Sequence, residues 1–177
     1  MSAAETMSGA SGPERFPSML ARAKDLADIF EVVKEAVRVK LGVSRAGLML
    51  GLAELGGGSG SFIGGMYPVA SNIIIVNRGP MNRVRSSSPE LYSAYAFHIL
   101  LHEYVHSIGY IDEEETRRRT LDISQALFGK EHLVTKLAED ICQFLPLFTY
   151  PVPSPMPEEI QLELVKGFDR SSVNYIS

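Results

Sequence analysis

Residues 96–109 read AFHILLHEYVHSIG, an apolar run that holds three of the four histidines of the chain. Apolar side chains through this stretch recur at spacings of three and four, which predicts one long helix that begins after Pro89 and ends at Gly109. In a helix, His102 and His106 lie one turn apart on the same side. The segment therefore predicts a largely apolar helix that presents two imidazoles on one face.

The chain before this helix predicts one further helix and a small sheet. Apolar residues at helical spacing predict a helix from about Pro17 to Leu41, with Gly42 as its stop. The Arg-, Ser- and Pro-rich residues 78–88 predict a loop. Three apolar segments bounded by turn residues predict strands, at about residues 46–55, 61–67 and 72–77.

The chain after the histidines predicts two more helices. Asp112, with Glu115 three residues later, forms a capping box, which opens a helix that ends near residue 128. Another helix is expected at about residues 131–145, because its apolar residues keep helical spacing up to Pro146.

These elements predict an α+β fold, in which an N-terminal helix and a three-stranded, mainly antiparallel sheet precede the histidine-bearing helix and further helices. A chain of 177 residues suits one domain. We expect that domain to span residues 16–177, with a Pro-rich segment from residue 146 that is weakly helical near residues 158–166. The Ala-, Ser- and Gly-rich residues 1–15 predict a disordered tail.

Charge and composition argue against several classes of partner. The net charge is −4, and the only basic cluster, residues 117–119, follows three glutamates that neutralise it in a helix, so no nucleic-acid partner is expected. No apolar stretch reaches the length of about 18 residues that spans a bilayer, so no membrane partner is expected either. The single cysteine, Cys142, lies in an apolar run and predicts a buried, inert thiol in a reducing compartment such as the cytoplasm.

The stretch His102-Glu103-Tyr104-Val105-His106 carries the clearest chemistry. Two imidazoles one turn apart can bind one tetrahedral zinc ion, while Glu103 emerges about 100° further round the helix and is free to act as a base. Zinc lowers the pKa of a coordinated water toward about 7, and a nearby glutamate can take the proton and deliver it to a leaving amine. His98, one turn before His102, is expected on the helix surface.

The motif and its surroundings resemble a zincin metallopeptidase, and the small size is similar to that of minigluzincins. The order of helix, three-stranded sheet and motif helix fits that family, and residues 65–67 and 72–77 are similar to its strand pair before the motif helix. The resemblance covers about residues 17–145. It implies zinc-dependent hydrolysis of peptide bonds in peptides or unfolded proteins, with an edge strand that binds the substrate main chain.

The third zinc ligand stays open between two positions. Gly109 and Asp112 extend the motif to a pattern that resembles metzincins with aspartate as third ligand, although Asp112 also suits a helix cap. The gluzincin arrangement instead takes a glutamate from a later helix, and Glu139 is the best placed. Glu131 and Asp140 are weaker candidates, and we favour Asp112 over Glu139.

Two further questions remain open from the residues alone. A non-catalytic zinc-binding or interaction protein and a zinc hydrolase of another amide are the alternatives to a peptidase, although Glu103 argues for catalysis. The segment after Pro146 could inhibit the site, with Asp169 or the terminal carboxylate reaching the zinc, or the chain could self-associate. The same segment could instead pack on the helices and complete the core.

Overall fold

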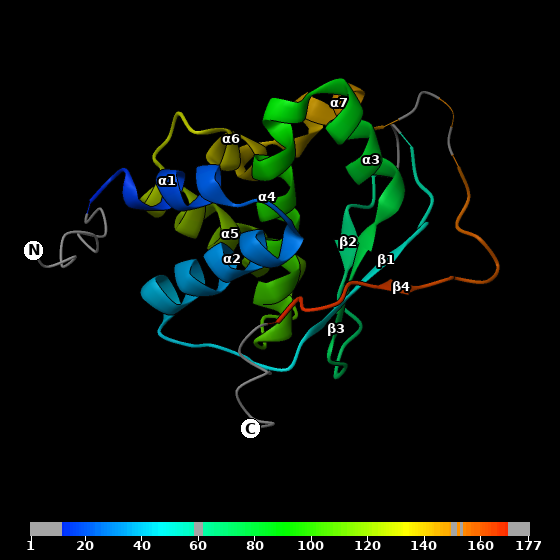
Figure 1. Ribbon diagram of the computed structural model, residues 1–177, viewed down its shortest axis with the longest axis horizontal. Coiled ribbons are helices and arrows are strands. Elements are labelled where there is room, and N and C mark those ends of the chain that lie inside the picture. Colours follow the sequence, from blue (N-terminus) through cyan, green and yellow to red (C-terminus); the bar gives the residue numbers. More distant parts are fainter. Residues whose placement is uncertain (1–11, 59–61, 150–151, 153, 170–177) are drawn as a thin grey trace, which may run out of the picture.

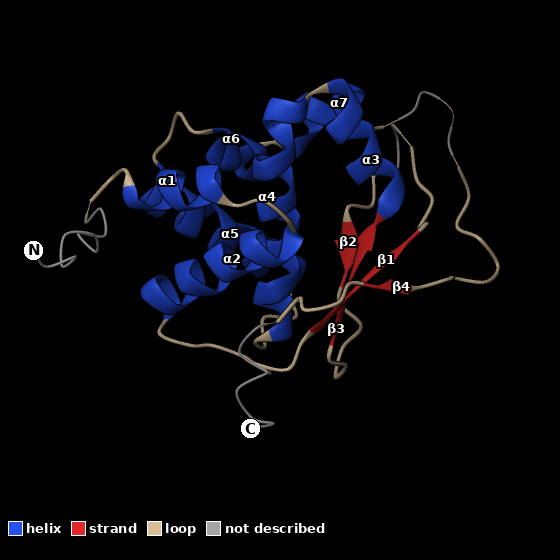
Figure 2. Ribbon diagram, in the orientation of Figure 1, coloured by secondary structure: helices blue, strands red, loops and turns tan. Residues whose placement is uncertain are grey.

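Seven α-helices and one four-stranded mixed sheet make up the part of the chain that the structure describes, residues 12–58, 62–149, 152 and 154–169 of a computed structural model. The helices gather on one side and the sheet stands beside them (Figure 1, Figure 2). The predicted α+β class is confirmed. None of the described helices combines the length and the apolar character that a membrane span requires.

Helix α4 (Pro89–Ser107) carries the two histidines and lies at the centre of the molecule. It contacts α1, α2, α3, α5 and α6 as well as strands β2 and β3 (Figure 1). Its apolar residues face all round, and a helix of that kind is stable only when it is covered on most sides. Tyr95, Leu100 and Tyr104 are fully buried, so the core holds the histidine-bearing helix in place from several directions.

The predicted N-terminal helix is two helices, α1 (Arg15–Arg22) and α2 (Leu26–Leu41). The break has a local cause, because the Asp25 side chain accepts a hydrogen bond from the Asp28 N–H at 2.8 Å and so caps a new helix. The predicted stop at Gly42 is confirmed, with φ of 70°.

The sheet has four strands rather than the predicted three: β1 (Met49–Ala53), β2 (Gly65–Met66), β3 (Ile73–Asn77) and β4 (Glu163–Leu164). Their order is β2-β3-β1-β4, with β1 and β3 parallel and each edge strand antiparallel to its neighbour. The prediction of a mainly antiparallel sheet is therefore wrong for the central pair. Both inner strands are apolar nearly throughout, which is the pattern of parallel strands covered on both faces.

Residues 78–88, predicted as a loop, form helix α3 (Arg78–Ser87). Its polar composition obscured the helical periodicity of the sequence. Only Met81 and Val84 are buried in the core, and one pair of apolar residues three positions apart is too little to predict a helix. Pro80 falls in the first turn, where a missing N–H costs no intrahelical bond.

The second half of the chain follows the prediction until Asp140. Helix α5 (Glu113–Phe128) begins after Asp112, as the capping box predicts. Next come α6 (Leu133–Glu139), a 3-10 turn η1 (Ile141–Phe144) and α7 (Leu145–Phe148), in place of one predicted helix. Asp140 breaks that helix because its side chain accepts a hydrogen bond from the Cys142 N–H at 3.0 Å. Cys142 is exposed, so the prediction of a buried thiol is wrong.

The C-terminal segment completes the core and the sheet. Strand β4 replaces the weak helix expected near residues 158–166. Phe168 stacks on Phe30 with ring centroids 4.1 Å apart, and Asp169 forms an ion pair with Lys34 at 2.8 Å. Asp169 is thus bound to α2, so inhibition through its carboxylate is not the arrangement seen. The predicted tail up to residue 11 and the terminal carboxylate lie outside the described residues.

Candidate metal centre

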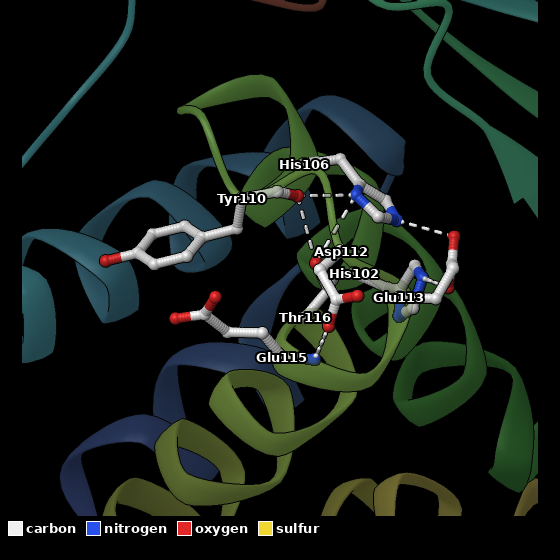
Figure 3. A network of polar contacts seen from close by, with 7 residues as sticks. All are labelled: His102, His106, Tyr110, Asp112, Glu113, Glu115 and Thr116. Carbon is white, nitrogen blue, oxygen red and sulfur yellow. Dashed lines mark hydrogen bonds and ion pairs between the residues drawn. The ribbon is translucent and has the colours of Figure 1, made fainter.

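Three side chains from two helices meet at the end of α4. His102 and His106 come from α4, and Glu113 is the first residue of α5. The Glu113 carboxylate places Oε2 3.2 Å from His102 Nε2 and Oε1 2.8 Å from His106 Nε2 (Figure 3). Each residue offers one ligand atom, and these atoms all lie within 4.8 Å of one another. We call this group the His–His–Glu cluster.

The connection between α4 and α5 places Glu113 there. The Gly109 N–H donates to the His106 carbonyl at 3.1 Å, and the Tyr110 N–H donates to the Val105 carbonyl at 3.4 Å, so the chain reverses tightly after α4. Gly109 has φ of 120°, a conformation that favours glycine. The short connection then starts α5 beside the last turn of α4, with its first side chain toward the imidazoles.

The structure brings Glu113, and not Asp112, to the histidines. Asp112 is the N-cap of α5, and its carboxylate accepts a hydrogen bond from the Glu115 N–H at 2.8 Å (Figure 3). A carboxylate that caps a helix turns toward the free backbone N–H groups of the first turn, so the Asp112 carboxylate is directed at its own helix. The neighbouring residue is the one that faces α4.

The alternative ligands lie further away. Glu139, at the end of α6, lines a cavity that also reaches His102, but its carboxylate is not a member of the cluster. Asp140 lines the same cavity and caps η1. Glu131 lies by a different cavity, together with Phe16 and His132.

The hydrogen bonds of His106 fix which ring nitrogen faces the cluster. His106 Nδ1 lies 2.7 Å from the Tyr110 carbonyl, which can only accept, so Nδ1 carries a hydrogen. Thr116 Oγ1 donates to the same carbonyl at 3.0 Å and supports it. In a neutral imidazole, Nε2 then offers a lone pair toward the Glu113 carboxylate, another acceptor. Two acceptors repel each other at this distance, so a proton or a metal cation has to lie between His106 Nε2 and the Glu113 carboxylate.

The donor types of the cluster are ones that bind zinc, and its three ligand atoms could hold a metal ion. Ligands about 2.0–2.1 Å from a tetrahedral ion lie about 3.3 Å from one another, close to the separations of 2.8 and 3.2 Å in the cluster. Burial lowers the pKa of His102, which favours the neutral imidazole that binds metal. The backbone carbonyl behind His106 is the partner that a metal-binding histidine usually has.

Glu103 stands beside the cluster without belonging to it. Its side chain is buried, and burial, with a smaller contribution from the Glu113 charge, raises its pKa to about 8. Glu103 lines two cavities that meet at the cluster, one of about 180 Å³ and one of about 420 Å³. A carboxyl group with a pKa near neutrality, next to a site with room for a ligand, suits proton transfer.

Edge strand β2 runs along both cavities. Gly64 and Gly65 line the larger one, and Met66 and Tyr67 line the smaller one. The two glycines allow this approach, because a Cβ at Gly65 would lie 2.8 Å from the Ile75 carbonyl oxygen and one at Gly64 would overlap Ile99 Cδ1. The two glycines interrupt the predicted strand, and their lack of a side chain lets this segment pack closely against α4.

Arg45 ties the hairpin of β2 and β3 to the end of α4. Its guanidinium donates to the Tyr67 hydroxyl at 2.8 Å and to the carbonyls of Ser71 and Ser107 at 2.7 Å each. Ser107 is the last residue of α4, and a cation there also suits the helix dipole. Arg45 was not singled out in the sequence, because its partners lie 22 to 62 positions away.

His98, expected on the helix surface, is buried and lines the larger cavity. Its Nδ1 has no hydrogen-bond partner among the residues that the structure describes. Burial, and to a lesser extent the neighbouring His102, lowers its pKa to about 3, so the ring is neutral. The apolar neighbours Phe97 and Ile99 were the signal for burial.

Comparison with known proteins adds no assignment, because no family model, no curated protein sequence and no solved structure matches this chain.

Proposed function

We propose that this protein is a zinc-dependent hydrolase that cleaves peptide bonds. The observation that carries the proposal is the His–His–Glu cluster with the buried Glu103 beside it. His102, His106 and Glu113 would hold the metal, and Glu103 would act as the general base. The sequence motif supports the two histidines and Glu103, and the spatial arrangement supports Glu113.

A catalytic site is favoured over a purely structural one by the number of ligands. A structural zinc site usually has four protein ligands, whereas a catalytic site keeps one position open. The cluster has three donors within the described part of the chain, and the Glu113 side chain is 60% exposed, so the site is accessible. The two cavities on either side of Glu103 give a substrate room to reach it.

The roles of the residues follow from their positions. Zinc, when bound, supplies Lewis acidity that polarises a carbonyl group and makes water a better nucleophile. Glu103 accepts the proton of the attacking water and gives it to the leaving amine. Burial raises the pKa of Glu103, and a metal in the cluster would act in the opposite direction and favour the ionised carboxylate that a base requires.

A peptide is the substrate class that the surroundings favour. Strand β2 is at the edge of the sheet, where an extended main chain can add by β-augmentation. The resemblance implies that an edge strand binds the substrate main chain, and beside the cavities that edge position belongs to β2, since β3 is an inner strand. Val69 and Ile111, 67% and 66% exposed, offer apolar contact at the smaller cavity.

Zinc binding is tested first, with His102→Ala/His106→Ala and with His132→Ala as the matched control. His132 caps α6 and lies outside the cluster. We expect about one zinc per chain in the wild type and in the control, and none in the double variant, by elemental analysis. Zinc in the double variant at the wild-type stoichiometry would exclude this site.

Catalysis is tested with Glu103→Gln, which keeps the shape of the side chain but cannot accept a proton. We expect normal zinc content and a loss of about 10²–10⁴ in kcat on a peptide library. Glu114→Gln, an exposed carboxylate next to Glu113 that lines neither cavity, is the control for a change of charge nearby. Wild-type cleavage by Glu103→Gln would show that Glu103 is not the base. If the wild type binds zinc but cleaves no peptide, the proposed hydrolase is wrong and the protein is a non-catalytic zinc-binding protein.

A further inference from the structure

The larger cavity continues past the residues that the proposed chemistry uses. It begins at the His–His–Glu cluster, which we call its metal end, and it reaches the end of α6 and η1, which we call its far end. Its volume is about 420 Å³, and Ile99, Leu137 and Ile141 give it apolar walls. A space of this kind, next to the proposed metal, can take one long side chain of a bound peptide.

Acidic side chains outnumber basic ones along this cavity. Four carboxyl groups line it, those of Glu103, Glu113, Glu139 and Asp140. Among the described residues that line it, Arg117 is the one arginine or lysine. A zinc ion in the cluster would offset Glu103 and Glu113, which stand at the metal end. Glu139 and Asp140, both exposed, would keep their charge.

The arginine does not neutralise the far end. Arg117 follows Glu113 by one turn of α5, and its charge acts on His102, so it belongs to the metal end. Glu139 and Asp140 come from the end of α6, and neither forms an ion pair with a basic side chain in the part of the chain that the structure describes. The far end therefore keeps an excess of negative charge, and apolar walls strengthen the field of such charges.

Glu103 is a buried acid that opens into the same cavity without a partner. It is 6% exposed, and its carboxyl group has neither a hydrogen bond nor an ion pair among the described residues. Burial and the neighbouring Glu113 both disfavour its negative charge, and no cation of the protein offsets them. An acid in this state favours a cation in the space that it faces. Zinc at the cluster and a cationic side chain in the cavity both meet that need.

We propose that the larger cavity selects a lysine or arginine side chain of the substrate peptide, with Glu139 as the main partner of the cationic end and Asp140 as the second. The inference rests on the proposed peptide hydrolysis, because it assigns the substrate preference of the same site. Glu139 is the main partner because the Asp140 carboxylate already accepts the Cys142 N–H that caps η1.

The shape and charge of the cavity suit the two parts of such a side chain. Its methylene groups contact the apolar walls, while its charged end stays hydrated at the exposed far end, beside Glu139 and Asp140. An acidic side chain meets like charges there. An apolar side chain of the same length gains the walls but no ion pair.

Direct binding to the zinc-loaded Glu103→Gln protein tests the preference apart from catalysis, since this variant keeps both partners at the far end. The probes are short fluorescein-labelled peptides of alanine and serine in which one position, scanned along the peptide, holds Lys, Arg, norleucine or Glu. We expect one position at which Lys or Arg binds about fivefold more tightly than norleucine by fluorescence anisotropy at low salt, with Glu the weakest. At high salt this advantage should fall to about twofold, because ions screen exposed charges.

Three results would overturn the inference. The first is equal binding of the Lys and norleucine peptides at every position. The second is an equal advantage of Lys at every position, which would show a general attraction to an acidic protein. The third is the absence of peptide binding.

Variants that remove charge locate the preference. In the Glu103→Gln protein, Glu139→Gln and Asp140→Asn together should bring the Lys and norleucine peptides to within about twofold of each other, with Glu139→Gln the larger contributor. Asparagine caps a helix as well as aspartate does, so Asp140→Asn keeps η1. Glu114→Gln, an exposed acid that does not line the cavity, is the control and should keep the preference. An undiminished preference without the Glu139 and Asp140 charges would place recognition elsewhere.

The single cysteine gives an independent measure of position. Cys142 is exposed and lines this cavity at the far end. At about ten times its Kd, the Lys peptide should slow alkylation of Cys142 in Glu103→Gln about tenfold, and the norleucine peptide at the same concentration only about threefold. Unprotected Cys142 at saturating Lys peptide would show that the side chain binds outside the cavity. Selective binding without cleavage by the wild type would refute hydrolysis alone, and cleavage without selectivity would refute the pocket alone.

Discussion

Two clusters in this protein join a carboxylate to nitrogen groups on a neighbouring helix, and they are completed in different ways. Asp169 meets Lys34 of α2 at 2.8 Å and also accepts a hydrogen bond from the Leu48 N–H at 3.2 Å. Glu113 meets two imidazoles of α4 at 2.8 and 3.2 Å. The side chain of Asp169 is 1% exposed, whereas that of Glu113 is 60% exposed.

The first cluster contains a permanent cation, the Lys34 ammonium, and the second has two imidazoles in its place. Burial opposes the charge of Lys34, but hydrogen bonds and charges from Asp169 and Glu31 outweigh it and raise its pKa. In the His–His–Glu cluster, His106 Nδ1 is bonded to a carbonyl, so a proton or a bound cation has to lie between His106 Nε2 and the Glu113 carboxylate. The comparison teaches that an acid with a cation of its own chain stabilises the fold, whereas an acid that faces lone pairs leaves a place for an external cation.

Removal of the carboxylate from the Lys34 cluster should give the largest loss of stability. We expect Asp169→Ala to lower the free energy of unfolding by about 3 kcal/mol, because it takes a buried carboxylate away from a largely buried ammonium. Denaturant titration measures this. Glu163→Ala, which breaks an exposed ion pair with Arg78, is the control and should cost at most about 1 kcal/mol. Zinc content should not change in either variant, and a cost for Asp169→Ala as small as the control's would contradict the comparison.

Removal of the carboxylate from the other cluster should affect metal rather than stability. Loss of a residue that only supports a ligand costs 10- to 100-fold in metal affinity, so loss of a ligand should cost at least about 100-fold, or about 2.7 kcal/mol. We expect this for Glu113→Ala, by competition with a zinc chelator. Glu114→Ala, one residue further on, is the exposed control. If Glu139→Ala loses zinc and Glu113→Ala does not, the ligand comes from α6.

The sequence predicts the part of the site that one helix determines. His102, Glu103 and His106 need only helical periodicity, and the cap at Asp112 needs only local hydrogen bonds. Glu113 is harder, because three consecutive glutamates open α5 and the direction of each side chain depends on the turn at Gly109. If α5 began one residue earlier, Asp112 would take the position toward the histidines that Glu113 has.

The sheet was less predictable for a related reason. The strand segments are clear in the sequence, but the pairing of β1 with β3, and the arrival of β4 more than 85 residues after β3, depend on long-range packing. Nothing local marks residues 163–164 as a strand, since Glu163 and Leu164 are both exposed. Burial of Phe168 and Asp169 against α2 brings that segment to the sheet.

His98 is a buried polar group outside the two clusters, and the dependence of stability on pH tests whether it is neutral. Its pKa of about 3 in the folded protein lies below the ordinary value of 6.5, so the unfolded chain takes up a proton first as the pH falls. Stability is complete above pH 6.5 and decreases toward pH 3, with about 2 kcal/mol lost at pH 5. In metal-free protein, His98→Leu should remove that part of the change between pH 7 and pH 5, measured by denaturant titration. An identical pH dependence in the two proteins would show that His98 is not a buried neutral group.

The smallest expected effect belongs to Asp112, and it decides between two adjacent carboxylates. Asp112 accepts a hydrogen bond from the Glu115 N–H, so Asp112→Ala should cost about 1 kcal/mol of stability through loss of the cap while zinc affinity stays within a few-fold. Asp112→Ser sharpens the test, because serine is as good a cap as aspartate but has no carboxylate for zinc. This variant should match the wild type in both stability and zinc affinity. If Asp112→Ser instead loses zinc as strongly as we expect of Glu113→Ala, the turn at Gly109 rearranges on metal binding and brings Asp112 to the histidines.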